Sequence, residues 1–260
     1  MVSAAKLRRA QDRVISARPY AYKIQVVLNS LVARAASKAH PLLEQRSEKR
    51  IRLVVVTADK GLCGGFNANI IKAARAFMDE HLEKTVSLNC VGRKGRDHFR
   101  REKATIAREF VNLFQKVEYS HAKQIAQSLI EEYATGETDA VYLVFNEFKS
   151  VIQQRIVVER LLPIQTLPGT SEETLIDYIY EQTAEAIFQN LIPKYVEVQI
   201  FRALLESAAA EHGARMTAMD AATNNAVDII DSLTLTMNRA RQAKITTEII
   251  EIVSGAAALE

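Results

Sequence analysis

The C-terminal quarter of the sequence is the feature that most constrains the fold. Between Lys194 and Ser254 the chain contains no proline and one glycine, Gly213. A helix over these residues would be roughly 90 Å long at 1.5 Å per residue. A compact domain of this chain's length has a radius of gyration of only about 18 Å. We therefore expect a helix from about residue 194 that extends beyond its own domain.

Apolar residues recur in alternating steps of three and four near both ends of the chain. They run from Leu7 to Ala35 at the N-terminus and from Met216 to Ala240 near the C-terminus. This period of 3.5 residues is typical of a left-handed coiled coil. Pro19 interrupts the N-terminal pattern without shifting its phase, which predicts one bent helix. We predict that the N- and C-terminal segments form an antiparallel two-helix coiled coil.

The middle of the chain alternates between strand and helix patterns, which favours a Rossmann-like α/β domain with a mostly parallel sheet. Strands are expected at 51–57, 86–91, 139–148 and 150–162, the last two paired, and helices at 69–82, 93–101 and 120–133, the last capped by Ser120. We therefore predict three parts: an N-terminal coiled-coil helix over 1–50, the α/β domain over 51–165, and C-terminal helices over 166–260. The first C-terminal helix is expected from 171 to 191, and Pro193 marks a kink or a restart.

Charge is distributed unevenly. Residues 1–50 carry eleven Lys and Arg against three acids, whereas residues 194–260 carry six against nine. A basic segment is typical of binding to nucleic acid, anionic lipid or an acidic protein, and a solvated helix face explains it equally well. Because no aromatic residues interleave the basic ones, we expect no nucleic-acid partner. No apolar run approaches the roughly 18 residues of a membrane span, and two cysteines favour a reducing compartment.

A glycine-rich turn, Gly61-Leu-Cys-Gly-Gly-Phe-Asn67, follows the first strand, where nucleotide-binding loops occur. It matches neither G-x-G-x-x-G, because Cys63 takes the second glycine position, nor a P-loop. We favour a tight turn that lets backbone pack closely, and the alternative is a stand-alone nucleotide-binding α/β protein with helical arms. Cys63 has no histidine nearby in sequence and is interpreted as a structural thiol. The scattered histidines give no metal-ligand spacing, so we predict no metal, no cofactor and no catalytic residue.

The stretch from Leu233 to Glu248 mixes amides, hydroxyls and cations. Arg239, Arg241 and Lys244 have no acid nearby before Glu248. Guanidinium groups suit bidentate pairing with a partner's carboxylates, and a solvated face is the alternative. A bare two-helix rod with half-exposed apolar residues would be marginal in water. We therefore expect a shaft or connector inside a larger assembly, with a generic coiled-coil tether as a further alternative.

Three stretches carry a resemblance to a known family. They are Met1 to Arg8, the turn 61–67, and a C-terminal set whose longest runs are Ala214 to Thr223 and Glu251 to Ala256. Together they resemble the gamma subunit of the rotary ATP synthase, over essentially the whole chain. That family has a further helical stretch before the position of Met1, roughly twenty residues or about 30 Å. The cysteine-pair insert of the chloroplast type is missing, so thiol regulation is not expected.

The resemblance implies a non-catalytic rotor shaft that couples ion-driven rotation of a membrane ring to ATP synthesis or hydrolysis. It implies contacts with the alpha and beta subunits, the epsilon subunit and the membrane c ring. It also implies a peripheral location on the cytoplasmic face of the bacterial inner membrane. The loop 38–50, with Lys49 and Arg50, is the expected foot. The residues expected to contact the ring are Arg215, Asn238, Arg239, Arg241, Gln242, Thr246 and Glu248.

Overall fold

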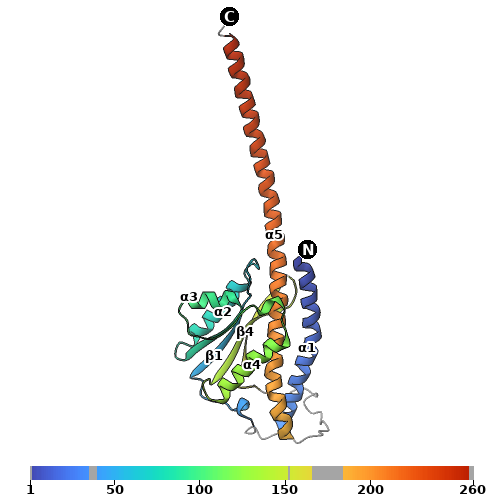
Figure 1. Ribbon diagram of the computed structural model, residues 1–260, viewed down its shortest axis with the longest axis vertical. Coiled ribbons are helices and arrows are strands. Elements are labelled where there is room, and N and C mark those ends of the chain that lie inside the picture. The colour runs from blue at the N-terminus through green and yellow to red at the C-terminus, as the bar shows by residue number, and fades with distance from the viewer. Residues whose placement is uncertain (1, 35–39, 152, 166–183, 258–260) are drawn as a thin grey trace. The chain divides into compact units, whose positions relative to one another are not determined.

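The computed structural model describes residues 2–34, 40–151, 153–165 and 184–257 (Figure 1). The chain divides into two compact units, Met1–Thr217 and Ala218–Glu260, which are described separately below. The helices are α1 (Val2–Arg34), α2 (Phe66–Glu80), α3 (Arg93–Arg101), α4 (Tyr119–Ala134) and α5 (Ala184–Ala257), with short 3-10 turns η1 (Pro41–Leu43) and η2 (Leu113–Gln115). The strands are β1 (Arg50–Val56), β2 (Thr85–Val91), β3 (Ile106–Phe110), β4 (Ala140–Phe148) and β5 (Gln154–Leu162).

A five-stranded sheet in the order β3-β2-β1-β4-β5 forms the centre of the first unit. The first four strands are parallel and β5 pairs antiparallel with β4. The predicted α/β class and mostly parallel sheet are therefore confirmed. Strand β3 was not predicted, because Ile106-Ala-Arg-Glu-Phe110 has two adjacent charged residues and its three central positions are exposed at the sheet edge.

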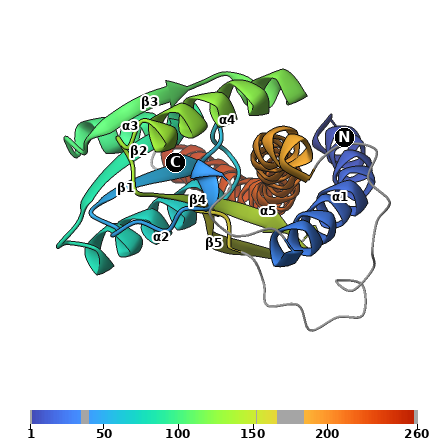
Figure 2. The same cartoon turned by 90° about the horizontal axis from the view of Figure 1, so that it is seen from below.

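Helices cover both faces of the sheet (Figure 2). On one face, Phe77 of α2 packs against Tyr142 of β4, with ring centroids 4.8 Å apart and the rings tilted by 51°. On the other face, Glu132 of α4 accepts a 2.8 Å hydrogen bond from Arg52 of β1. Arg202 of α5 lies over the Phe145 ring on this same side. The sheet is therefore enclosed by α2 and α3 on one side and by α4 and the first part of α5 on the other.

Helix α1 packs on the outer side of α5 and runs antiparallel to it, as predicted (Figures 1 and 2). Arg18 meets Glu206, while the later α1 residues Ala21 and Ile24 meet the earlier α5 residue Val198. The predicted α1 seam is buried or half-buried from Leu7 to Leu28. Pro19 lies inside one continuous helix, so the bent-helix interpretation is preferred over two helices.

The predicted C-terminal seam is partly covered at its start and exposed further along. Met216 and Met219 are half-buried, whereas Ile230 and Leu233 are 61% and 62% exposed. The spacing of apolar residues predicts that a helix has a partner, but it does not identify that partner.

Helix boundaries differ at three places. Pro193 lies inside the continuous helix α5, so of the two expected alternatives, a kink or a restart, the restart is wrong. Helix α4 is capped by Glu118 and His121 in a reciprocal capping box, not by Ser120. The helix expected over 171–191 falls largely outside the described residues. The expected exit of the first helix at residues 38–41 also falls partly outside them.

Candidate functional site

The glycine turn after β1 lies where the strand order reverses, between β1 and β4. Doubly wound folds bind ligands in the crevice at this edge. Here the first unit's part of α5 lies on the turn: Arg215 donates to the Gly61 carbonyl at 3.1 Å and to Glu211 at 2.6 Å. The Arg215 side chain is only 17% exposed. The turn is therefore packed against a helix of its own chain.

Polar side chains around the turn accept hydrogen bonds from backbone N–H groups. Asp59 accepts the backbone N–H groups of Arg93 and Asn112 at 3.1 and 2.8 Å. Asn67 accepts the Ala58 N–H and donates to the Cys63 sulfur. These contacts support the predicted tight structural turn, in which polar groups tie neighbouring loops together.

Burial shifts the pKa values of two titratable side chains near the turn. Burial raises the pKa of the Cys63 thiol, so the reactive thiolate is disfavoured. Burial, together with the positive charges of Arg215 and Lys6, lowers the pKa of His212 to about 4. The raised thiol pKa disfavours the thiolate that a cysteine nucleophile needs, and a pKa of about 4 makes His212 a weak base for activating it.

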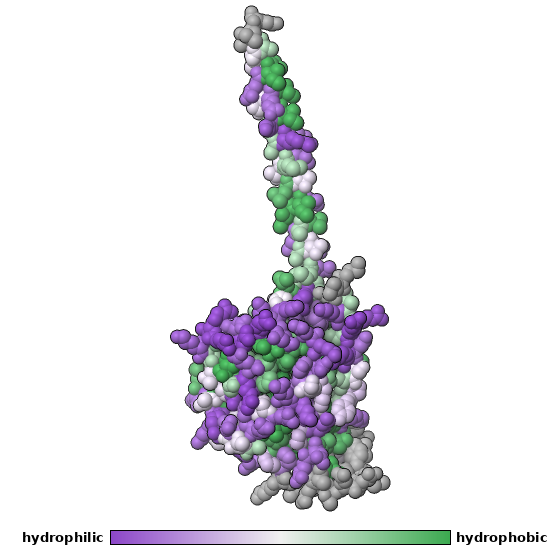
Figure 3. Space-filling model, in the orientation of Figure 1, coloured by the Kyte–Doolittle hydropathy of each residue, from purple (hydrophilic) through white to green (hydrophobic). Residues whose placement is uncertain are grey.

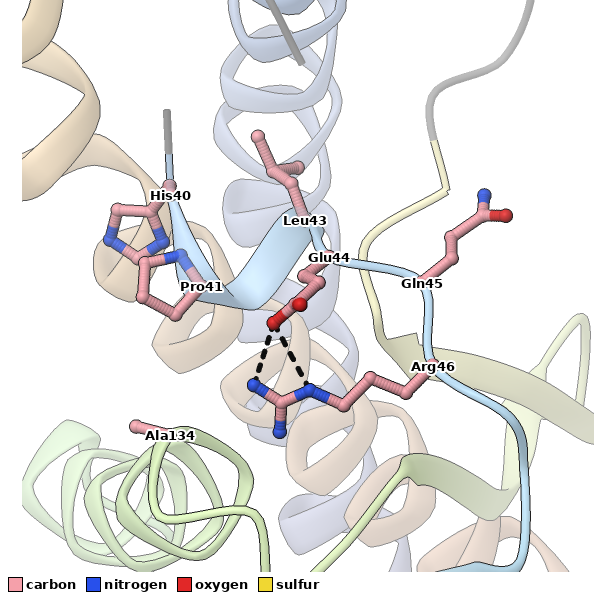
Figure 4. A pocket seen from close by; sticks show the side chains of 7 residues that line it. All are labelled: His40, Pro41, Leu43, Glu44, Gln45, Arg46 and Ala134. Atoms are coloured by element: carbon pink, nitrogen blue, oxygen red, sulfur yellow. Dashed lines mark hydrogen bonds and ion pairs between the residues drawn. The ribbon is translucent and has the colours of Figure 1, made fainter. Parts of the chain in front are cut away.

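A surface pocket of about 870 Å³ lies beside η1 in the expected foot loop (Figure 4). Arg46 crosses it, donating to Glu44 and to the Tyr133 carbonyl at 2.8 Å. Arg50 is bound to Asp139 through both its backbone N–H and its guanidinium, at 2.8 and 2.9 Å. Arg50 therefore has a partner within the chain, although its side chain is 52% exposed, and Lys49 is exposed as well. Lys38 lies outside the described residues.

The second unit is helical from residue 218 to 257, about 60 Å at 1.5 Å per residue. Eleven large apolar side chains between Val227 and Val253 are exposed. Figure 3 shows hydrophobic residues recurring along this helix. Several of them, such as Val227, Ile229 and Leu235, lie off the predicted seam. The signal that could have found them is an apolar pattern around most of the helix circumference, which is typical of a helix enclosed by protein.

Six of the seven expected contact residues lie on this unit. Asn238 is half-buried, and Arg239, Arg241, Gln242, Thr246 and Glu248 are exposed. Thr246 donates its hydroxyl to the Gln242 carbonyl at 2.9 Å, so towards a partner its oxygen can only accept. Glu248 lies 3.9 Å from Lys244, a loose and exposed pair that contributes little. Arg215, the seventh, lies in the first unit with the partners given above.

Two further properties bear on the kind of protein this is. Within the part of the chain that the structure describes, no three His, Cys, Asp or Glu side chains come together to hold a metal ion. Among the described helices, none combines the length and apolar content that crossing a membrane requires.

Comparisons with known proteins find matches over essentially the whole chain. A family model described as ATP synthase matches residues 1–259. The ATP synthase gamma chain of Solibacter usitatus is 52% identical over 264 residues, which covers 100% of this chain and 91% of the relative. The gamma chain of Pelotomaculum thermopropionicum is 51% identical with the same two coverages. The chain belongs to the ATP synthase gamma-chain family.

Solved structures agree with this fold. The matching chain of the Tetrahymena thermophila mitochondrial ATP synthase central stalk and c-ring has a TM-score of 0.66 at 24% identity, covering 86% of this chain and 96% of that chain. A chain of the Euglena gracilis mitochondrial ATP synthase has a TM-score of 0.64 at 17% identity, covering 98% and 95%.

Membership of the gamma-chain family confirms the expected function. A gamma chain is the non-catalytic central-stalk subunit of the rotary ATP synthase. The alternative of a stand-alone nucleotide-binding protein receives no support, since the glycine turn is packed by α5 and the family assigns the whole chain.

Proposed function

We propose that residues 218–257 are the part of this gamma chain that turns inside the ring of alpha and beta subunits. The observation that carries the proposal is the row of exposed apolar side chains from Val227 to Val253. Exposed apolar surface of this extent marks a protein interface. A ring that encloses the helix would cover apolar residues on more than one side, as their distribution requires.

The asymmetry of the helix explains how rotation changes catalysis. A single helical shaft has no threefold symmetry, whereas its sleeve of three alpha and three beta subunits does. Each third of a turn presents different side chains to each beta subunit. Differential contact energies then shift each beta subunit between open and closed states. In this proposal the helix makes its polar contacts through Asn238, Arg239, Arg241, Gln242, Thr246 and Glu248. Arg215 of the first unit, 17% exposed and paired within its own chain, is proposed as a seventh contact outside that helix.

The first unit is proposed to face the epsilon subunit and the membrane c ring. The exposed Lys49 and the pocket beside η1 support the loop after α1 as the foot. Polar, acidic loops of a ring would complement that charge. We place the complex at the cytoplasmic face of the bacterial inner membrane, with this chain as a peripheral subunit, because the relatives cited above are bacterial gamma chains.

The test is Arg241→Ala combined with Gln242→Ala in reconstituted ATP synthase. Both side chains are exposed, so the melting temperature of the isolated chain should stay within about 2 °C. We expect assembly or ATP turnover to fall at least about threefold, because each lost polar contact at an interface costs about 1–2 kcal/mol.

The matched control is Asp220→Ala with Asn224→Ala, two exposed residues on the same helix that are outside the proposed contacts. This pair should leave assembly and turnover near wild type. A melting-temperature drop as large as a core mutation gives, or normal assembly and turnover, would contradict the assignment of Arg241 and Gln242.

A further inference from the structure

Arg18 of α1 joins three elements of the first unit. Its Nε and Nη2 atoms donate to the two carboxylate oxygens of Glu206 on α5, at 2.8 and 2.9 Å. The Nη2 atom also donates to the Phe148 carbonyl at the end of β4, at 2.7 Å. The Phe148 N–H donates in turn to Glu206 at 2.9 Å. Both polar groups of one backbone position are therefore bound to the α1–α5 ion pair.

The packing between α1 and α5 does not by itself define one axial position. Small residues line both helices, with Ala10, Ala17 and Ala21 on α1 and Ala203 and Ala208 to Ala210 on α5. Alanine surfaces have shallow ridges, so a helix can move by one turn, about 5.4 Å, and still pack. Buried apolar side chains such as Val14 and Leu28 stabilise the association of the two helices, but they do not by themselves fix the axial position of one helix along the other.

The ion pair makes such a move unfavourable. The Glu206 side chain is only 3% exposed. A slip by one turn would carry Arg18 away and leave a buried carboxylate without its cation, which is strongly destabilising. A polar group at a buried position is a well-attested device for fixing the register of packed helices. Here that group is Glu206, whose partner Arg18 is 42% exposed. The hydrogen bond to Glu206 also raises the pKa of Arg18, so the guanidinium remains charged.

We propose that Arg18 and Glu206 are positioning residues that hold α1, α5 and the end of β4 in one register. The consequence rests on the proposed rotor function: torque applied to the sheet reaches the helices without slippage because this pair locks them together. Without the pair, the two helices would stay associated through the alanine residues that line them, but they would sample neighbouring registers.

The register is tested by electron paramagnetic resonance distances in assembled ATP synthase that contains the full chain. Spin labels are attached at Ile15, 63% exposed on α1, and at Gln189, exposed on α5. The buried Cys63 and Cys90 are replaced by alanine so that only the introduced cysteines react. These labels should give one narrow distance distribution.

The decisive variant is Arg18→Met combined with Glu206→Gln. The introduced amide leaves no buried charge and still offers an oxygen to the Phe148 N–H, so folding is preserved. We expect a second distance about 5 Å from the first, corresponding to one helical turn. Arg18→Lys, which keeps a cation beside Glu206, should restore the single distance. An unchanged distribution in the double variant would overturn the proposal.

A matched control removes another ion pair of α5. Arg202 of α5 and Glu159 of β5 lie 2.5 Å apart and join α5 to the sheet, and Arg202 also borders a small pocket beside Ala17 and Ala21 of α1. Arg202→Met with Glu159→Gln should leave the α1–α5 distance unchanged. A second distance in this control as well would show that any lost ion pair loosens α5, and would overturn the specific role of Arg18.

Ion pumping per ATP hydrolysed gives the functional readout. In the Arg18→Met, Glu206→Gln variant it should fall at least twofold, while ATP hydrolysis stays within twofold of wild type. Unchanged pumping with a shifted distance would refute the torque-locking consequence. Failure of the wild-type chain to support pumping would refute the rotor function itself, and the distance measurement would still decide the register.

Discussion

At the residue scale, Gly92 shows why a turn outside the proposed contact surface can decide whether the chain folds. Its φ angle is +91°, and a Cβ at this position would lie 2.1 Å from the Thr57 carbonyl oxygen. Only glycine combines that backbone angle with such close approach. The loop after β1 and the start of α3 depend on this contact.

We predict that Gly92→Ala lowers the free energy of unfolding by about 3 kcal/mol or more, because strain and a backbone clash add. Urea denaturation of the full chain measures it. Gly61→Ala is the control: its Cβ would meet only the end of the Lys94 side chain, at 3.7 Å. The control should change stability by about 0.5 kcal/mol or less, and an equal loss in both variants would refute the argument.

Individual residues were predicted unevenly from sequence. The structural reading of the glycine turn follows from composition, since Cys63 breaks both nucleotide motifs. The partners of Arg215 and Arg50 could not be predicted, because Gly61 and Asp139 are distant in sequence and meet only through the fold. The lone acid Glu206 between Leu205 and Ser207, in a stretch of apolar and small residues, was a usable signal for a buried ion pair.

At the element scale, Pro19 lies inside α1. Proline removes the hydrogen bond that would reach the carbonyl of Ile15 and costs about 3 kcal/mol in a helix interior. Pro19 itself is exposed, so a substitution disturbs little packing. We predict that Pro19→Ala raises the free energy of unfolding by about 1–3 kcal/mol.

The measurement is chemical denaturation of the full chain. Ser16→Ala, three residues earlier on the same helix and also exposed, is the control and should change stability by about 0.5 kcal/mol. A destabilised Pro19→Ala variant would instead indicate that the fixed proline angle is needed for α1 to follow α5.

The period of apolar residues predicted helices better than it predicted their partners. The α1 seam is buried or half-buried as expected, but the C-terminal seam is exposed from Thr223 onward. A heptad repeat indicates that a helix packs against a partner, but it does not identify the chain that supplies the partner. Strand β3 was missed for a related reason, since an edge strand with exposed positions lacks the apolar run that identifies buried strands.

At the scale of the whole molecule, the last twelve residues test whether the chain is a shaft or only a tether. Residues 249–260 include the exposed Ile249, Ile250, Ile252 and Val253. We predict that their removal allows assembly and reduces ion pumping per ATP severalfold, because apolar contact with the ring is lost at about 25 cal/mol per Å². Reconstituted enzyme in vesicles measures it.

Removal of residues 258–260 alone is the control and should leave coupling intact. A generic tether predicts a different result for the longer deletion, namely unchanged partners and unchanged coupling. The fold class and the family could thus be predicted from the sequence, while the three-part division at residues 50 and 165 and the ring contacts stay predictions.

The threonine hydroxyls of the second unit bear on how easily this helix can turn inside the proposed ring. Thr223, Thr234, Thr236, Thr246 and Thr247 each donate to a carbonyl one turn back in their own helix. Donors satisfied in this way need no partner from a surrounding sleeve, so a step of the motor breaks fewer bonds across the interface. We therefore expect this apolar surface to rotate with little resistance, and we expect a small number of charged side chains to make its specific contacts.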